Sequence, residues 1–93
     1  VKVMLICRTV IFRGTVQGVG FRWTTMRLAG SYAVSGTVRN CDDGSVELVA
    51  EGDADEVSAF VAAVSGRLGS YIDSMSSADA PASGRFRGFR ITD

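Results

Sequence analysis

Residues 14–22 read GTVQGVGFR and lie between an apolar segment and an amphipathic one. Gly14, Gly18 and Gly20 allow positive φ angles, so successive N–H groups of this stretch can turn inward and form a concave nest for an anion. Arg22 would then lie at the start of a helix, where about half a positive charge and unpaired N–H donors already favour anions. A guanidinium there can bind two phosphate oxygens at once. The stretch therefore predicts the end of a strand, the start of a helix and a binding site for one phosphate-sized group.

A second interpretation of the glycines stays open, because glycines between a strand and a helix can mark only a tight connection. Two well-known phosphate loops are excluded. The stretch lacks the Gly-Lys-Ser/Thr ending of a Walker A loop, and its glycine spacing is not the dinucleotide fingerprint G-x-G-x-x-G. A bound nucleotide is therefore not indicated.

The segments on either side of this stretch predict its strand and its helix. Residues 3–13 are rich in Val, Ile, Leu and Phe, which predicts a central strand, although Arg8 interrupts the alternation and leaves the start of the strand loosely defined. From residue 21 onward a stripe recurs at helical spacing, and Gly30 is expected to end the helix. The stripe comprises Phe21, Thr25, Leu28, Ala29 and Tyr32.

The middle of the chain predicts a hairpin and a second helix. Residues 34–41 alternate as a strand, residues 42–44 (DDG) form the turn, and residues 45–50 return as the next strand. The second helix is expected to begin with a capping box made by Asp53 and Glu56. Its apolar face consists of Val57, Phe60, Val61, Val64 and Leu68.

The C-terminal third predicts a short strand at 71–75, a small-residue loop at 76–84 and a last strand at 86–92. The element order is then βαββαβ with a short extra strand, which predicts an α+β ferredoxin-like sandwich, an antiparallel sheet with two helices on one face. In that topology the two strands that precede and follow the first helix run parallel, separated by a third. Their carboxyl ends meet at one edge, which should bring the loop after Arg13 next to Asn40.

Length, composition and charge narrow the class of protein. A chain of 93 residues with 46% apolar residues predicts a single domain, residues 1–93. Its core is large enough to be stable without disulfide bonds or a structural metal. Ten basic and ten acidic residues give a net charge of zero, which argues against nucleic acid and against a membrane surface as partners. The chain has no apolar run near the ~20 residues of a membrane span and does not begin like a secretory signal. We expect a cytoplasmic monomer.

The chain has no histidine and only two cysteines, Cys7 and Cys41. This excludes most zinc patterns and every catalytic scheme that needs an imidazole. The predicted topology places the two thiols near opposite ends of the sheet, well beyond the ~7 Å between Cα atoms that a disulfide can bridge. Both cysteines are therefore expected to be free thiols.

The stretch at 14–22 also resembles the signature of the acylphosphatase family, G-x-V-Q-G-V-x-F-R, at every specified position. Residues 36–40, GTVRN, resemble the family's second motif, G-x-V-x-N, at the family's usual distance. The resemblance covers nearly the whole chain and thins after the second helix, where residues 67–70 replace a frequent Gly-Pro. Thr37 stands where many members have tryptophan. These departures lie outside the two motifs.

The resemblance implies hydrolysis of the carboxyl-phosphate bond of acyl phosphates to carboxylate and inorganic phosphate, without metal or cofactor. Such a substrate has a good leaving group, so the enzyme must mainly hold the phosphoryl group and position a water. The loop 15–21 and Arg22 would hold the phosphate, and Asn40 would orient the water, whose proton passes to a phosphate oxygen of the substrate. The expected phosphate-binding residues are Val16, Gln17, Gly18, Val19, Gly20, Phe21 and Arg22. The expected catalytic residues are Arg22 and Asn40, and the expected partners are a small-molecule acyl phosphate and inorganic phosphate.

Three residue roles stay open. Asn40 could instead cap the bend at 42–44. Trp23 could stand at the rim of the site or pack on the flank of the helix. Thr25 matches a threonine of the family one turn below Arg22, but an ordinary core-facing threonine would explain it equally well.

Three rival functions are also open. An RNA-binding module of the same topology would need exposed aromatic and basic residues, and the C-terminal strand has a faint version of this pattern. That pattern consists of Arg85, Phe86, Arg87, Phe89 and Arg90. A non-catalytic, regulatory ligand-binding domain of similar fold would need neither Arg22 nor Asn40. The third rival is an acylphosphatase-like domain related to hydrogenase maturation.

Overall fold

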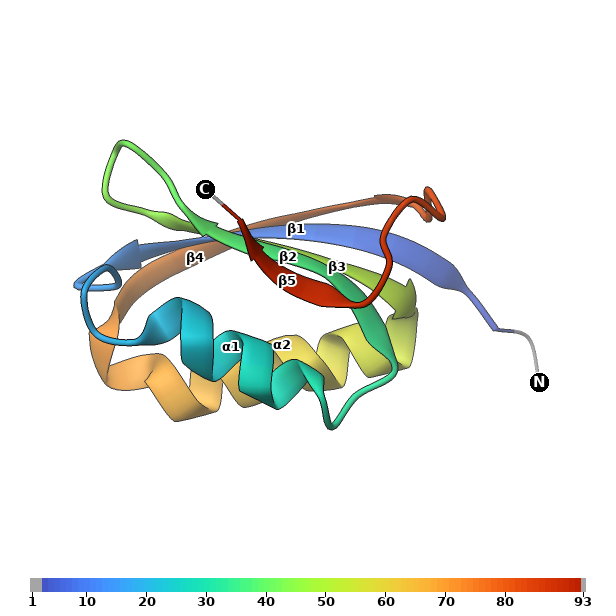
Figure 1. The fold of residues 1–93 in the computed structure, drawn as a ribbon, viewed down its shortest axis with the longest axis horizontal. Helices are drawn as coiled ribbons and strands as arrows, with labels where there is room; N and C mark the ends of the chain where they lie inside the picture. Colours follow the sequence, from blue (N-terminus) through green and yellow to red (C-terminus); the bar gives the residue numbers. More distant parts are fainter. Residues whose placement is uncertain (1–2, 93) are drawn as a thin grey trace.

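The computed structural model describes residues 3–92, which form a five-stranded sheet with both helices on one of its faces (Figure 1). The elements are β1 (Leu5–Gly14), α1 (Phe21–Ala29), β2 (Val34–Asn40), β3 (Val46–Asp53), α2 (Ala54–Leu68), a 3-10 turn (Gly69–Tyr71), β4 (Ile72–Pro81) and β5 (Phe89–Thr92). The predicted helix from residue 21 ends at Ala29, one residue before the expected Gly30.

The strand order in the sheet is β4-β1-β3-β2-β5. Both β1 and β2 pair antiparallel with β3, so they run parallel to each other, as predicted. The short extra strand is β5, which pairs parallel with β2 and makes the sheet mixed. The α+β ferredoxin-like arrangement with two helices on one face is confirmed.

The register of the sheet brings the ends of β1 and β2 together. Phe12 of β1 and Asn40 of β2 both lie opposite Val46 of the central strand β3. The loop after β1 therefore starts at the same end of the sheet as Asn40, with only β3 between them. The topology predicts this arrangement.

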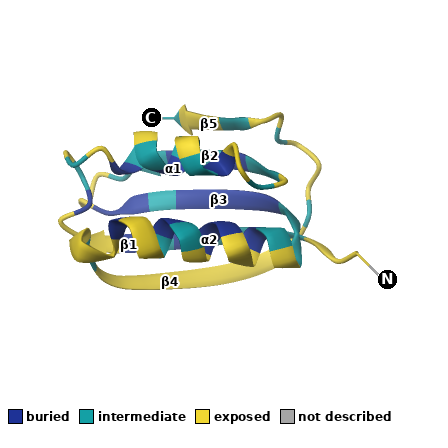
Figure 2. Ribbon diagram, turned by 90° about the horizontal axis from the view of Figure 1, so that it is seen from below, coloured by how far each residue is buried: buried dark blue, intermediate teal, exposed yellow. Residues whose placement is uncertain are grey.

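The core lies between the sheet and the helices. Most of its buried residues come from α2 and β3 (Figure 2). All five residues of the predicted apolar face of α2 are buried. In the stripe of α1, Phe21, Thr25 and Ala29 are buried, while Leu28 and Tyr32 are half-buried and pack against the core. Arg8 is hydrogen-bonded through its guanidinium to Ser58 of α2 and to Asp79 of β4. These contacts explain how a charged residue interrupts the apolar pattern of the first strand.

The prediction for the C-terminal third was wrong in two respects. The last strand was expected at 86–92, but β5 begins only at Phe89. A short strand at 71–75 followed by a loop at 76–84 was expected, but β4 runs from Ile72 to Pro81 and pairs with β1 along that length. Nearly every residue of β4 is exposed, because it is an edge strand that the helices do not cover (Figure 2). Small polar side chains are therefore tolerated in β4, and its backbone pairing with β1 keeps it in the sheet.

The predicted capping box at the start of α2 was also wrong. The side chain of Asp53 makes no capping hydrogen bond. The N–H of Ala54 donates instead to the carbonyl of Met4, at 2.8 Å, and Glu56 accepts from the N–H of Ala33, at 2.9 Å. β3 runs directly into α2, so the acceptor for the first N–H of the helix comes from the segment before β1.

Cys7 and Cys41 are free thiols, as predicted. In the described part of the chain, neither helix has the length and apolar character that crossing a bilayer requires.

Candidate active site

The loop between β1 and α1 depends on glycine at both ends. Gly14 has a φ of 138°, and a Cβ added there would lie 2.4 Å from the carbonyl oxygen of Tyr71 and 2.7 Å from the backbone N of Asp73. No other residue therefore fits without moving the 3-10 turn and the start of β4. Gly18 and Gly20 have φ angles of 78° and 79°, in the left-handed region that favours glycine. These angles give the loop the tight curvature that the sequence predicts.

The N-terminus of α1 is left open to a ligand. Its N-cap residue is Gly20, which has no side chain that could accept from the first N–H groups. The first turn contains no acidic residue. Since unpaired N–H groups at a helix start attract anions, this end of α1 is suited to a phosphate.

A cavity of about 200 Å³ lies at this helix end. It is lined by Val16, Gly18, Gly20, Phe21, Arg22, Trp23, Asn40 and Ile91. Both predicted catalytic residues, Arg22 and Asn40, therefore lie on the same cavity. Val16 and Phe21 have buried side chains, so they offer mainly their backbone to a ligand.

Gln17 and Val19 are the two expected phosphate-binding residues that do not line the cavity. The amide Nε2 of Gln17 donates to the carbonyl oxygens of Cys41 and Ser45, at 2.8 and 2.9 Å. Val19 packs against the core. Gln17 thus connects the loop to the hairpin that follows Asn40. This contact joins distant parts of the chain, so the position of Gln17 in the motif could not predict it.

The hairpin turn between β2 and β3 is built without the side chain of Asn40. Asp43 accepts hydrogen bonds from the N–H and hydroxyl of Ser45 and from Arg13, and the N–H of Gly44 donates to the carbonyl of Cys41. The hydroxyl of Ser45, followed by its N–H and by the guanidinium of Arg13, lowers the pKa of Asp43 to about 2. Within residues 3–92, Asn40 makes no side-chain bond to this turn, so the contact that the capping interpretation needs is not made.

Asn40 Oδ1 is buried and has no hydrogen-bond partner among residues 3–92. A buried acceptor without a donor is costly, and such atoms often belong to sites that a ligand or water completes. Thr25 Oγ1 is in the same situation on the core side of α1. Asn40 therefore lines the cavity and has a buried acceptor that no residue in 3–92 uses.

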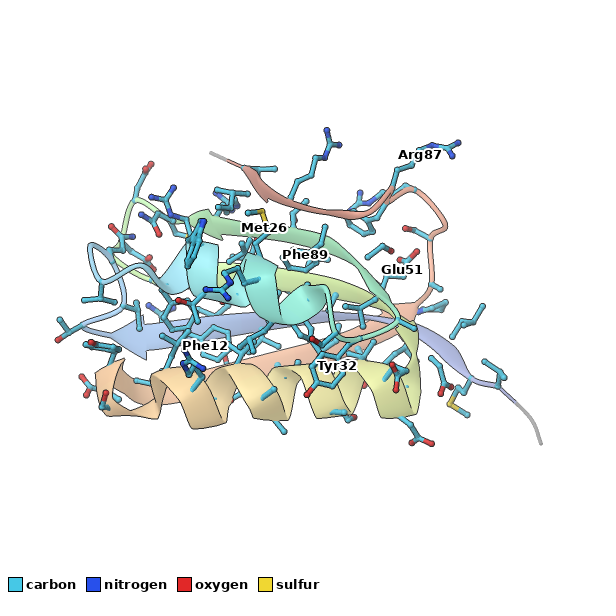
Figure 3. All side chains as sticks on the ribbon, turned by 60° about the horizontal axis from the view of Figure 1, so that its bottom comes forward. Phe12, Met26, Tyr32, Glu51, Arg87 and Phe89 are labelled. Carbon is cyan, nitrogen blue, oxygen red and sulfur yellow. The ribbon has the colours of Figure 1, made fainter. Side chains whose placement is uncertain are left out.

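β5 contributes Ile91 to the wall of the cavity. Glu51 holds the segment that leads to β5. The buried carboxylate of Glu51 accepts from the N–H and hydroxyl of Ser83 and from the N–H of Gly84, at 2.7–2.9 Å. These bonds, the N–H of Ser83 first, lower the pKa of Glu51. Figure 3 shows Glu51 beside the segment that leads to Phe89 and β5. Ile91, which this segment carries to the cavity, was not among the predicted site residues because the parallel β2–β5 pairing was not predicted.

Comparison with known proteins places the chain in a family. The family model described as acylphosphatase matches residues 8–91. A protein named acylphosphatase from Paenarthrobacter aurescens (strain TC1) is 45% identical over 86 residues, which cover 91% of this chain and 92% of the relative. The chain belongs to the acylphosphatase family. The predicted family and the predicted enzyme class, a hydrolase, are confirmed.

Solved structures agree with this assignment. The crystal structure of acylphosphatase from Bacillus subtilis superimposes with a TM-score of 0.82 at 32% identity, covering 97% of this chain and all of that one. HypF from T. kodakarensis superimposes with a TM-score of 0.80 at 28% identity, but the match covers 94% of this chain and only 12% of HypF. These two acylphosphatases thus match this chain over nearly their whole length, whereas HypF matches it over a small part.

Trp23 stands at the cavity that this acylphosphatase fold presents. Its side chain is 55% exposed and lines the cavity next to Arg22, while the guanidinium of Arg27 lies 4.8 Å from the centre of its ring. Trp23 therefore has features of both open interpretations, since it lines the cavity and also packs against Arg27 on the flank of α1.

The aromatic residues of the RNA-binding alternative are not freely presented. Phe89 points toward the helices, and its ring lies 5.5 Å from that of Phe60 (Figure 3). Phe86 is half-buried, with the guanidinium of Arg85 at 4.8 Å from its ring centre. A base therefore finds no exposed pair of rings here.

Proposed function

We propose that this chain hydrolyses acyl phosphates, with the phosphoryl group bound by the loop 15–21 and Arg22 and the attacking water oriented by Asn40. The observation that carries the proposal is that Arg22 and Asn40 line one cavity at the open N-terminus of α1, and that Asn40 has a buried Oδ1 without a hydrogen-bond partner among residues 3–92. A phosphate needs donors and positive charge, and a water needs an acceptor beside it. The cavity offers both kinds of group.

The phosphoryl group would bind at the positive-φ part of the loop. Backbone N–H groups there and the dipole of α1 stabilise its charge, and they need no reorganisation during the reaction. Arg22 is available for bidentate binding, because the arginines that form ion pairs within residues 3–92 are Arg8, Arg13 and Arg39.

Asn40 would act on the nucleophile. Its Oδ1 accepts a hydrogen from the water and holds the water oxygen in line with the bond to the leaving carboxylate. As the new bond between the water oxygen and phosphorus forms, the bond between phosphorus and the carboxylate oxygen breaks, and the electron pair leaves with the carboxylate. The water's proton passes to a phosphate oxygen, so no imidazole is required.

We further propose that the chain works as a cytoplasmic monomer on small molecules and has no nucleic-acid partner. Its net charge of zero gives no electrostatic attraction to nucleic acid. Its two free thiols suit a reducing compartment. Light scattering of the purified chain at micromolar concentration, with and without RNA, should give the monomer mass in both cases.

Acetyl phosphate hydrolysis in the presence of EDTA tests the proposed function. The rate should be the same with and without the chelator, and inorganic phosphate should inhibit competitively because the loop binds the same tetrahedral dianion as product. Arg22→Gln should weaken this inhibition, while Arg87→Gln, an exposed arginine at the other end of the molecule, should leave it unchanged (Figure 3). An inactive protein, or noncompetitive inhibition, would contradict the proposal.

A further inference from the structure

A second cavity of about 200 Å³ adjoins the first one and takes no part in the steps above. It is lined by Trp23, Thr24, Arg27, Leu28, Ser31 and Arg67. α1 supplies Trp23, Thr24, Arg27 and Leu28. Ser31 follows the helix, and Arg67 comes from the end of α2. Trp23 lines both cavities and forms the wall between them. We call this second cavity the Arg27–Arg67 groove.

The groove combines positive charge with an apolar wall. Its two guanidinium groups face no acidic residue in the lining, and neither forms an ion pair within residues 3–92. The ring of Trp23 and the side chain of Leu28 provide apolar surface, and Thr24 and Ser31 add hydroxyl groups. Such a lining fits a short apolar chain that ends in a carboxylate or phosphate.

Helix dipoles offer a simpler reason for each arginine alone. Arg27 lies in the last turn of α1 and Arg67 in the last turn of α2, where a positive charge is favourable. The dipoles do not require the two arginines, from different helices, to line one cavity. They also do not require that cavity to share a tryptophan with the candidate active site.

The groove adjoins the cavity in which the phosphoryl group would bind, because Trp23 lines both. Arg27 follows Arg22 by five positions, which is about 7.5 Å along the helix axis and about 140° around it. A substrate held by its phosphoryl group at Arg22 must direct its acyl group out of the first cavity, and Trp23 stands on that boundary. An acyl group that crosses the tryptophan ring enters the groove.

We propose that the Arg27–Arg67 groove binds the far end of the acyl group and selects acyl phosphates that carry a second negative charge. The proposal rests on the proposed function, because the substrate is oriented by phosphoryl binding at the loop and Arg22. The substrate class is the monophosphates of dicarboxylic acids, or of acids that carry a further phosphate. The guanidinium of Arg27 covers one face of the Trp23 ring, and the other face is the surface on which the connecting chain or ring lies.

Two rigid substrates of matched shape test this selection. They are 4-carboxybenzoyl phosphate and 4-methylbenzoyl phosphate, which differ in one terminal charge and cannot cyclise. At low ionic strength the native chain should prefer the carboxylate in kcat/KM by about tenfold, as expected for partly exposed charge-assisted hydrogen bonds. Added salt should reduce this preference, because it screens exposed charges.

Variants of the groove locate the preference. Arg27→Gln and Arg67→Gln should each lower the ratio of the two kcat/KM values, and the double variant should bring it to about one. Arg87→Gln removes one exposed positive charge far from the groove, and it should retain the native ratio. Thermal melting checks that all variants fold.

The outcomes separate this proposal from the proposed function. Hydrolysis of both substrates with a native ratio near one, or with an unchanged ratio in the double variant, would overturn the groove assignment alone. An equal fall of the ratio in Arg87→Gln would assign the preference to the general field of the protein and overturn the groove as well. Failure to hydrolyse either substrate would overturn both proposals.

Discussion

The side chain of Gln17 supports the loop of the candidate active site. Gln17 is predicted to bind phosphate with the other residues of the loop, and its side-chain amide donates to two carbonyls of the β2–β3 hairpin. The two contacts hold the loop at a fixed distance from Asn40. We therefore regard Gln17 as a positioning residue that preserves the geometry between phosphate and water.

Gln17→Ala should raise KM for acetyl phosphate several-fold and lower the free energy of unfolding by about 1–2 kcal/mol, since two partly buried hydrogen bonds are lost. Steady-state kinetics and denaturant unfolding measure the two effects. The matched control is Thr15→Ala, an exposed neighbour in the same loop, which should change neither quantity. Unchanged KM and stability in Gln17→Ala would show that the loop holds its shape without this tie.

Arg22 and Asn40 differ from Gln17 because both residues line the cavity. Within the described chain, Arg22 forms no ion pair and Asn40 Oδ1 has no hydrogen-bond partner. Their roles as catalytic residues stay predictions. Their placement on one cavity follows from the backbone, because Phe12 and Asn40 flank the same residue of β3.

The turn between β2 and β3 depends on the charge of Asp43. Hydrogen bonds from Ser45 and the ion pair with Arg13 lower the pKa of this carboxyl from 3.8 to about 2. A group whose pKa is lower in the folded state stabilises the fold above its unfolded pKa, and this contribution disappears as pH falls through the folded pKa. The contribution of Asp43 is therefore present above about pH 4 and lost toward pH 2.

Asp43→Asn should melt at a lower temperature than the native chain at pH 7, and the difference should shrink between about pH 4 and pH 2. Melting curves over this pH range measure it. Asp42→Asn is the matched control, because Asp42 is the exposed neighbour and accepts no hydrogen bond within residues 3–92. A difference that stays constant down to pH 2 would mean that shape, and not charge, is what Asp43 contributes.

Strand β4 and the start of α2 mark the limits of local sequence patterns. Periodicity identified α2, because its apolar face is buried against the sheet and must repeat at helical spacing. It missed most of β4, because an exposed edge strand has no buried face to impose alternation. The predicted capping box was wrong because the N–H of Ala54 and the carboxylate of Glu56 have their partners in distant parts of the chain, at Met4 and Ala33.

For the whole molecule, the features that the sequence predicts correctly are those set by the order and direction of the strands. The two motifs converge because β1 and β2 run parallel on either side of β3, and this arrangement follows from element order alone. Ile91 and the tie made by Gln17 were missed, since both depend on pairings between distant segments. The site was therefore predictable in its charged and amide groups, but its apolar wall and its support were not.

The turnover number of Asn40→Ala with acetyl phosphate tests the joint action of the two motifs most directly. If Asn40 orients the water, kcat should fall by a factor on the order of 10² to 10³, while the inhibition constant of phosphate and the melting temperature stay close to native values. A near-native kcat with a lowered melting temperature would contradict this assignment, because Asn40 would then support the β2–β3 hairpin and not the attacking water.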